Sequence, residues 1–110
     1  MMNNKMKFNV FWSKDAELAL IKHKQFINVK LAYKNSLTML SVNPHNQKEG
    51  VIDCGSEFDG YYWVNINNVI IFYRVDDDLK KVFIDGCSSA LTGEALRMYY
   101  GEYDPWLDDE

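Results

Sequence analysis

The stretch from residue 60 to residue 86, GYYWVNINNVIIFYRVDDDLKKVFIDG, constrains the fold of this 110-residue chain more than any other. Residues 61–66 and 82–84 are mostly aromatic or β-branched, and residues 69–75 form an almost unbroken apolar run. Such segments are typical of β-strands, and a continuous apolar run is typical of a strand buried on both faces. Asn67-Asn68 and three aspartates at 76–78 separate these segments, and residues of these types are common in tight turns. The sequence therefore predicts an antiparallel meander of three strands.

The residues before this meander predict one strand and two helices. Residues 7–12, KFNVFW, are rich in β-formers, and Ser13 is a suitable N-cap for a helix whose first turn is acidic. A helical pattern covers residues 14–42, with a break expected at residues 25–28 and with Pro44 closing it.

The second of these helices has the clearer apolar face. One set of residues recurs at helical spacing and should pack on the sheet: Val29, Tyr33, Ser36, Leu37 and Leu40. The opposite face of this helix is basic, and we expect it to be exposed to solvent.

The remaining segments complete an α+β fold. We expect a loop at 43–50, a short strand at 51–54, a short helix at 93–100 and an acidic tail at 101–110. Helices on one face of an antiparallel sheet make an α+β domain, and we take residues 1–110 as a single domain. The other face of the sheet is then at least partly open for binding.

Composition narrows the class of protein. Apolar residues make up 47% of the chain, which supports a folded protein. Cys54 and Cys87 lie far apart without a CxxC spacing, so we expect reduced thiols, no zinc site and no cofactor. No apolar segment is long enough to span a membrane, and the polar start does not resemble a signal peptide. We expect a cytoplasmic protein.

Charge is unevenly distributed along the chain. The net charge of −4 argues against a general nucleic-acid binder, yet residues 1–48 carry +6 and residues 49–110 carry −10. Such asymmetry suggests one basic and one acidic surface, and so two partners or partner regions. Ordinary solvated helices and turns would give the same distribution.

Several motifs resemble those of one family. A strand ends just before a Ser-x-x-Ala helix start at Ser13 and Ala16, and a helical hairpin ends in a proline. The block at 61–86 is similar to an aromatic strand, a short turn, an I-I-Y-x-V strand, an acidic turn and a V-x-I-x-G strand. Over about residues 7–90 the chain thus resembles the RelE/ParE superfamily of bacterial toxins. The resemblance implies a small protein that cleaves mRNA on the ribosome or, in other members, inhibits DNA gyrase, and that an antitoxin neutralises.

The resemblance also implies candidate catalytic residues. Family enzymes activate the RNA 2′-hydroxyl, stabilise the phosphorane with cations and protonate the leaving 5′-oxygen. The family's frequent arginine early in the I-I-Y-x-V strand is Ile70 here, and the basic or aromatic group expected after the last strand falls on residues 87–89. Arg74, roughly 13 Å further along the same strand face, and Glu49, in the preceding loop, are the substitute candidates. An aspartate-paired surface arginine and an exposed turn glutamate are the alternatives.

Other residues are candidates for binding. Tyr61, Trp63 and Asn65 share one strand face and could stack on bases or anchor a peptide, unless they complete a core. His23 and His45 have no partner in a recognisable motif, and no metal site is expected. Four lysines of the helical region are candidate phosphate contacts, although a solvated helix would look the same: Lys22, Lys24, Lys30 and Lys34.

We therefore expect the toxin-like component of a type II toxin–antitoxin pair, acting on translation as a ribosome-associated mRNA endonuclease with an atypical site. The alternative is a non-catalytic protein of the same fold, either of the gyrase-inhibitor type or an inactive member that retains only partner binding. An antitoxin is the expected partner in both cases, and the ribosome and mRNA only in the first.

Overall fold

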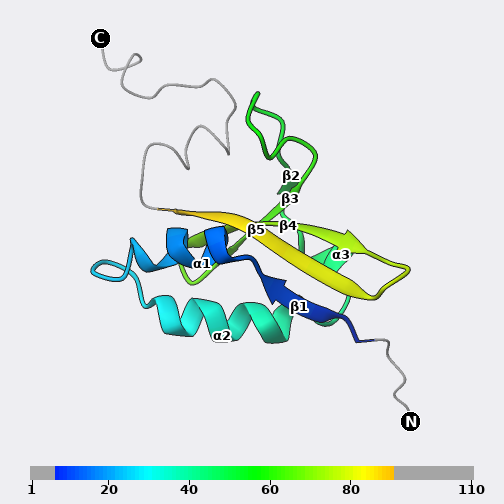
Figure 1. Cartoon of the computed structure of the whole chain (residues 1–110), viewed down its shortest axis with the longest axis horizontal. Helices are drawn as coiled ribbons and strands as arrows, with labels where there is room; N and C mark the ends of the chain where they lie inside the picture. Colours follow the sequence, from blue (N-terminus) through cyan, green and yellow to red (C-terminus); the bar gives the residue numbers. More distant parts are fainter. Residues whose placement is uncertain (1–6, 91–110) are drawn as a thin grey trace.

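A computed structural model describes residues 7–90, which form a five-stranded sheet with helices packed against it (Figure 1). In chain order the elements are β1 (Asn9–Trp12), α1 (Lys14–Ile21), α2 (Val29–Met39), α3 (Pro44–Gln47), β2 (Gly50–Val51), β3 (Tyr62–Ile66), β4 (Val69–Asp76) and β5 (Lys81–Ser89). The strand order is β1-β5-β4-β3-β2, with β1 parallel to β5 and the other neighbours antiparallel. The α+β class expected from the sequence is confirmed.

The predicted meander is present as β3, β4 and β5. Asn67 and Asn68 have φ values of 54° and 69°, so the β3–β4 turn uses the positive-φ conformations that asparagine tolerates. Strand β5 is longer than the predicted 82–84, because residues 86–89 continue to pair with β4. Strands β4 and β5 therefore form the longest pairing in the sheet.

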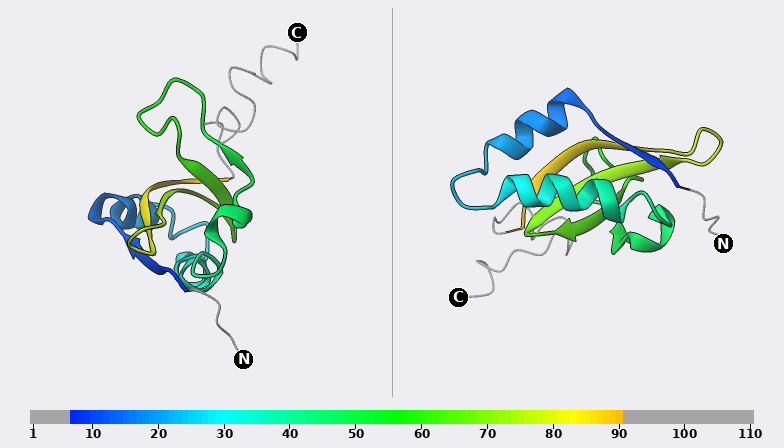
Figure 2. Two further views of the ribbon diagram at one scale, coloured as in Figure 1. Left: turned by 90° about the vertical axis from the view of Figure 1, so that its right-hand side faces the viewer. Right: turned by 90° about the horizontal axis from the view of Figure 1, so that it is seen from below.

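Strand β4 is buried on both faces, as its apolar run predicts. Val69, Ile71 and Tyr73 belong to the main core beneath the helices, whereas Ile70 and Phe72 face the other way. Figure 2 shows the sheet between α2 on one side and the loop 52–60, which projects on the other. Both sides of β4 therefore need a covering element.

The two helices begin at the N-caps that the chain supplies. The Ser13 hydroxyl accepts a hydrogen bond from the Ala16 backbone N–H at 3.0 Å, and the Asn28 side chain accepts one from Leu31 at 3.1 Å. The predicted break is confirmed, since α1 ends at Ile21 and α2 begins at Val29.

The predicted end of the helical region at Val42 is wrong. Helix α2 stops at Met39, and the Ser41 carbonyl accepts a hydrogen bond from the backbone N–H of Phe8 at 2.8 Å instead of continuing a helix. The chain then passes through Asn43, whose φ of 50° is left-handed, and Pro44 starts the short helix α3. The segment predicted as a loop thus contains one helical turn.

The strand predicted at 51–54 is also shorter, because β2 comprises only Gly50–Val51. The carboxylate of Asp59 accepts hydrogen bonds from the backbone N–H groups of Cys54, Gly55 and Ser56, and these bonds curl the chain into the loop 52–60. Strand β1 begins at Asn9, two residues later than expected. The helix predicted at 93–100 and the tail at 101–110 lie outside the described residues.

We predict that Tyr73→Phe lowers the free energy of unfolding by about 1 kcal/mol, because the change removes one buried hydrogen bond. The fully buried Tyr73 hydroxyl donates to the Pro44 carbonyl at 2.7 Å and so ties β4 to α3. Urea unfolding measures the change. Tyr33→Phe is the matched control, since the Tyr33 hydroxyl makes no hydrogen bond with a described residue. Equal losses in both variants would contradict the assignment.

Candidate functional site

The sheet face away from the helices carries a second apolar cluster beneath the loop 52–60. Ile52, Ile70 and Phe72 are buried in it, and five partly buried side chains pack against them: Cys54, Phe58, Tyr61, Trp63 and Ala90. The Gly60 N–H donates to the Ile52 carbonyl at 2.9 Å and closes the base of this loop, while Ile52 and Phe58 pack on the sheet. Ile70, at the position where the resemblance implies an arginine, is fully buried. Apolar packing therefore closes this part of the face.

The remainder of this face is more open and carries a row of aromatic and cationic side chains. Phe11 of β1 is paired with Phe83 of β5, and Phe83 with Arg74 of β4. The two phenylalanine rings stack with centroids 5.9 Å apart, and the Arg74 guanidinium carbon lies 4.4 Å from the Phe83 ring centroid. Phe11 is still 44% exposed. We call Phe11, Phe83, Arg74 and Tyr61 the aromatic–arginine row.

Arg74 and Tyr61 meet at the carboxylate of Asp85. The Arg74 Nε–H donates to Asp85 Oδ2 at 3.1 Å, and the Tyr61 hydroxyl donates to the same oxygen at 2.7 Å. Burial, followed by Asp85, raises the pKa of Tyr61. Burial lowers the pKa of Arg74, but Asp85 and Tyr61 outweigh it, and the net change is a rise. Arg74 is thus the aspartate-paired surface arginine that the sequence offered as an alternative.

A β-bulge in β5 interrupts the pairing with β4 at Asp85, which lies on the same face as Phe83. Phe72 pairs with Gly86 and Tyr73 with Ile84, which leaves Asp85 without a partner on β4. The extra residue shifts the alternation of side chains, so Asp85 and Gly86 both face away from the helices.

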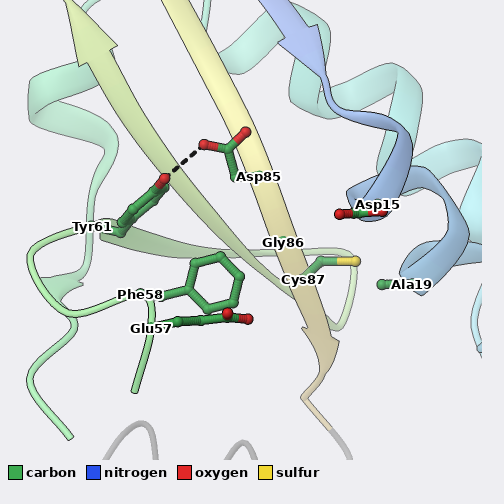
Figure 3. Close-up of a pocket in the computed structure, with 8 residues that line it drawn as sticks. All are labelled: Asp15, Ala19, Glu57, Phe58, Tyr61, Asp85, Gly86 and Cys87. Atoms are coloured by element: carbon green, nitrogen blue, oxygen red, sulfur yellow. Dashed lines mark hydrogen bonds between the residues drawn. The ribbon is translucent and has the colours of Figure 1, made fainter. Parts of the chain in front are cut away.

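A pocket of about 400 Å³ lies along β5 beside Asp85, between α1 and the loop 52–60 (Figure 3). Its walls come from three segments of the chain: Asp15, Ala19, Glu57, Phe58, Tyr61, Asp85, Gly86 and Cys87. The Phe58 ring lies directly over Gly86, where an added Cβ would stand 2.6 Å from Phe58 Cζ. Three lining residues are carboxylates and none is a cation. We call this pocket the acidic pocket.

Glu49 is not brought together with Arg74. Its carboxylate accepts a hydrogen bond from the Asn65 backbone N–H at 2.9 Å, at the edge formed by β2 and β3. Asn65 is paired with Ile70, four residues from Arg74, a separation of roughly 13 Å along the sheet. The Asn65 side chain accepts from the Asn68 N–H in the β3–β4 turn, which gives it a structural part. The two proposed catalytic residues therefore do not share one site.

The four candidate lysines lie in the helical layer, away from the aromatic–arginine row. Lys22 and Lys24 follow α1, Lys30 and Lys34 belong to α2, and all four are exposed. The helices pack on the opposite sheet face from Tyr61 and Trp63. A ligand that contacts both sets would have to pass around the edge of the sheet.

His45 has the partners that the sequence could not reveal. Its Nδ1 lies 3.0 Å from the Tyr62 hydroxyl and its Nε2 lies 2.9 Å from an Asp77 carboxylate oxygen. With Asp77 accepting from Nε2–H, Nδ1 is left to accept the Tyr62 proton. The Lys48 ammonium donates to the His45 carbonyl at 3.0 Å and lies 4.7 Å from the Tyr62 ring centroid. Tyr62 and Asp77 are 17 and 32 residues from His45, so no local motif signals this group.

Cys54 and Cys87 are not joined by a disulfide, and they lie in different apolar clusters. Burial raises the pKa of Cys87 to about 12, and its Sγ contacts the Ala16 carbonyl at 3.6 Å. Within residues 7–90 no group of three or more His, Cys, Asp or Glu side chains is placed to hold a metal ion, and no helix is long and apolar enough to cross a membrane.

Comparison with known proteins agrees with this architecture. No family model and no curated protein matches the sequence. The fold is similar to a chain in the crystal structure of the toxin–antitoxin complex RelBE2 from Mycobacterium tuberculosis, with a TM-score of 0.64 and 17% sequence identity. The match covers 80% of this chain and 97% of that chain. At this identity the likeness establishes the fold, which is RelE-like.

We predict that iodoacetamide alkylates Cys87 far more slowly in the native protein at pH 8 than after denaturation, because burial keeps the thiol protonated. Mass spectrometry of digested protein measures both rates. The unfolded chain ionises this thiol near its ordinary pKa of about 8.5, so stability should also fall as pH rises above that value and continue to fall to about pH 12. Cys87→Ala removes this part of the pH dependence. Equal alkylation rates in the two states would show that Cys87 is accessible.

Proposed function

We propose that this chain is the toxin-like component of a toxin–antitoxin pair, acts in the cytoplasm and has an antitoxin protein as its partner. The observation that carries the proposal is the RelE-like fold, which the chain shares over four-fifths of its length with a chain of a toxin–antitoxin complex. The motifs at residues 13–16 and 61–86 support it independently, since they were recognised from the sequence alone. Fold likeness by itself does not fix chemistry, so the mode of action needs its own argument.

Of the two modes of action, the described residues favour binding over RNA cleavage. Arg74 has its Nε committed to Asp85, and Glu49 has its carboxylate committed to a backbone N–H. Buried Ile70 supplies no charge for a phosphorane. The open face instead offers aromatic rings and a pocket, which are features of a surface that recognises a partner.

One observation favours the second candidate, a ribosome-associated mRNA endonuclease. The Tyr62–His45–Asp77 group has the arrangement of a general base held by a carboxylate, and Lys48 adds a cation beside it. His45 Nδ1 would take the Tyr62 hydroxyl proton while Tyr62 takes the proton of the RNA 2′-hydroxyl. The 2′-oxygen would attack phosphorus as the bond from phosphorus to the 5′-oxygen breaks, and water would protonate the leaving 5′-oxygen. The side chains of His45 and Asp77 are 43% and 60% exposed, so substrate could reach them.

Induced expression of this chain alone in a bacterial host tests the proposal. We expect prompt growth arrest, with mRNA that stays intact if the protein acts by binding. Expression of Val82→Asp is the control, since a carboxylate at this fully buried position should prevent folding and abolish arrest. Normal growth with abundant folded wild-type protein would contradict the toxin-like role.

Two substitutions separate the modes of action when purified protein is incubated with translating ribosomes and the mRNA is mapped. For a binding protein we expect no cleavage by the wild type. If cleavage occurs, His45→Gln should slow it by about 10²–10⁴-fold, the usual contribution of a general base, and Arg74→Ala should leave it within about tenfold. If only Arg74→Ala lost RNA cleavage, Arg74 and not His45 would be the catalytic residue.

A further inference from the structure

The open end of the sheet has apolar surface that no described element covers. The loop 52–60 shields Ile70 and Phe72, and α1 and α2 cover the opposite face. Phe11 and Phe83 lie outside the area that the loop and the helices cover, at the β1–β5 side of the sheet. The side chains near them are cationic, with the Arg74 guanidinium carbon 4.4 Å from the Phe83 ring centroid and the Lys81 ammonium 5.4 Å from the Phe11 ring centroid. Stacked aromatic rings held by strand pairing lose little conformational freedom on binding, which is the property of an interface anchor.

The acidic pocket adjoins this surface and calls for a positively charged group. Asp15, Glu57 and Asp85 line it, together with the aromatic side chains of Phe58 and Tyr61. Its volume of about 400 Å³ is large enough to admit a long side chain. Carboxylates and an aromatic ring are the groups that hold a guanidinium or ammonium by ion pairing and by cation–π contact.

Asp85 retains an acceptor for such a group. Arg74 and Tyr61 both use Oδ2, and Oδ1 makes no hydrogen bond with a described residue. Figure 3 shows the second carboxylate oxygen pointing away from Tyr61. Because two donors already fix the carboxylate, a ligand that binds Oδ1 does not have to order it first.

We propose that this end of the sheet docks a segment of a protein partner, with a lysine or arginine side chain in the acidic pocket and neighbouring apolar side chains on Phe11 and Phe83. The three carboxylates of the pocket favour a basic side chain over a phosphate there. Two cations also border the docking surface, since Arg74 pairs with Asp85 and the Lys81 ammonium lies 5.4 Å from the Phe11 ring centroid, so the preference for protein over RNA is assigned to the pocket and not to the two rings. The inference rests on the proposed function in one respect, since an antitoxin would supply the segment.

The test uses the full chain, labelled with ¹⁵N, and two capped peptides followed by two-dimensional NMR. The probe is acetyl-Leu-Leu-Arg-Leu-amide, and the matched control carries citrulline, which has the shape of arginine without its charge. We expect the arginine peptide to shift the signals of Phe11, Phe83 and Gly86 and to bind about tenfold more tightly than the citrulline peptide. Equal binding of the two peptides, or no shift with either at several millimolar, would overturn the proposal.

Single substitutions test whether the carboxylates of the acidic pocket bind the arginine side chain of the peptide. Glu57→Gln should weaken binding of the arginine peptide several-fold and leave the citrulline peptide unaffected, whereas Asp78→Asn, an exposed turn acid outside the pocket, should change neither. Gly86→Ala should push the Phe58 ring into the pocket and weaken the arginine peptide likewise, while the same spectra report whether the variant is folded. An equal loss in Asp78→Asn would reduce the effect to net charge.

A single-stranded RNA oligonucleotide added in the same experiment separates the two kinds of partner. Shifts at Phe11, Phe83 and Gly86 with RNA and not with the peptide would replace the protein partner by a nucleic acid. The result is independent of growth arrest. A chain that arrests growth without binding the peptide defeats this inference alone, and a chain that binds the peptide without affecting growth defeats the toxin-like role alone.

Discussion

The double burial of β4 is the constraint on which the rest of the structure depends. A strand with apolar residues on both faces is stable only if both faces are covered. The helices cover Val69, Ile71 and Tyr73, and the loop 52–60 covers Ile70 and Phe72. Because that loop must reach across β5, it brings Phe58 onto Gly86, and the acidic pocket is formed along the line where loop and strand meet. The loop that covers β4 therefore also forms one wall of the candidate site.

The parts of the fold that the sequence predicted are those that local interactions determine. The β3–β4 turn depends on Asn67 and Asn68, and the helix starts depend on Ser13 and Asn28, each of which contacts a residue a few positions away. The parts that were missed depend on distant partners. Helix α2 stops at Met39, and the Phe8 N–H holds the Ser41 carbonyl of the segment that follows; no pattern within α2 contains that contact.

The candidate site was predictable to a smaller extent for the same reason. Strand alternation correctly placed Tyr61 and Trp63 on one face, and base rates for surface arginines correctly gave Arg74 an aspartate partner. The identity of that partner was not accessible, because it depends on the register between β4 and β5, which a bulge at Asp85 shifts, and a single extra residue in a strand leaves no clear signal in the sequence. The His45 group combines residues from three segments of the chain, so it could not be predicted from the sequence.

The parallel pairing of β1 with β5 has a consequence for how the protein is made. Asn9 pairs with Lys81, so the first strand waits for a partner about 70 residues further along the chain. Contacts of such long range close slowly, and on the ribosome β1 is synthesised well before its partner β5. Phe11 can meet Phe83 only after this point. The surface that both rings build therefore comes into existence only after β5 has been synthesised, and a partner that recognises it would distinguish chains in which β1 and β5 are paired from chains in which β1 is still unpaired.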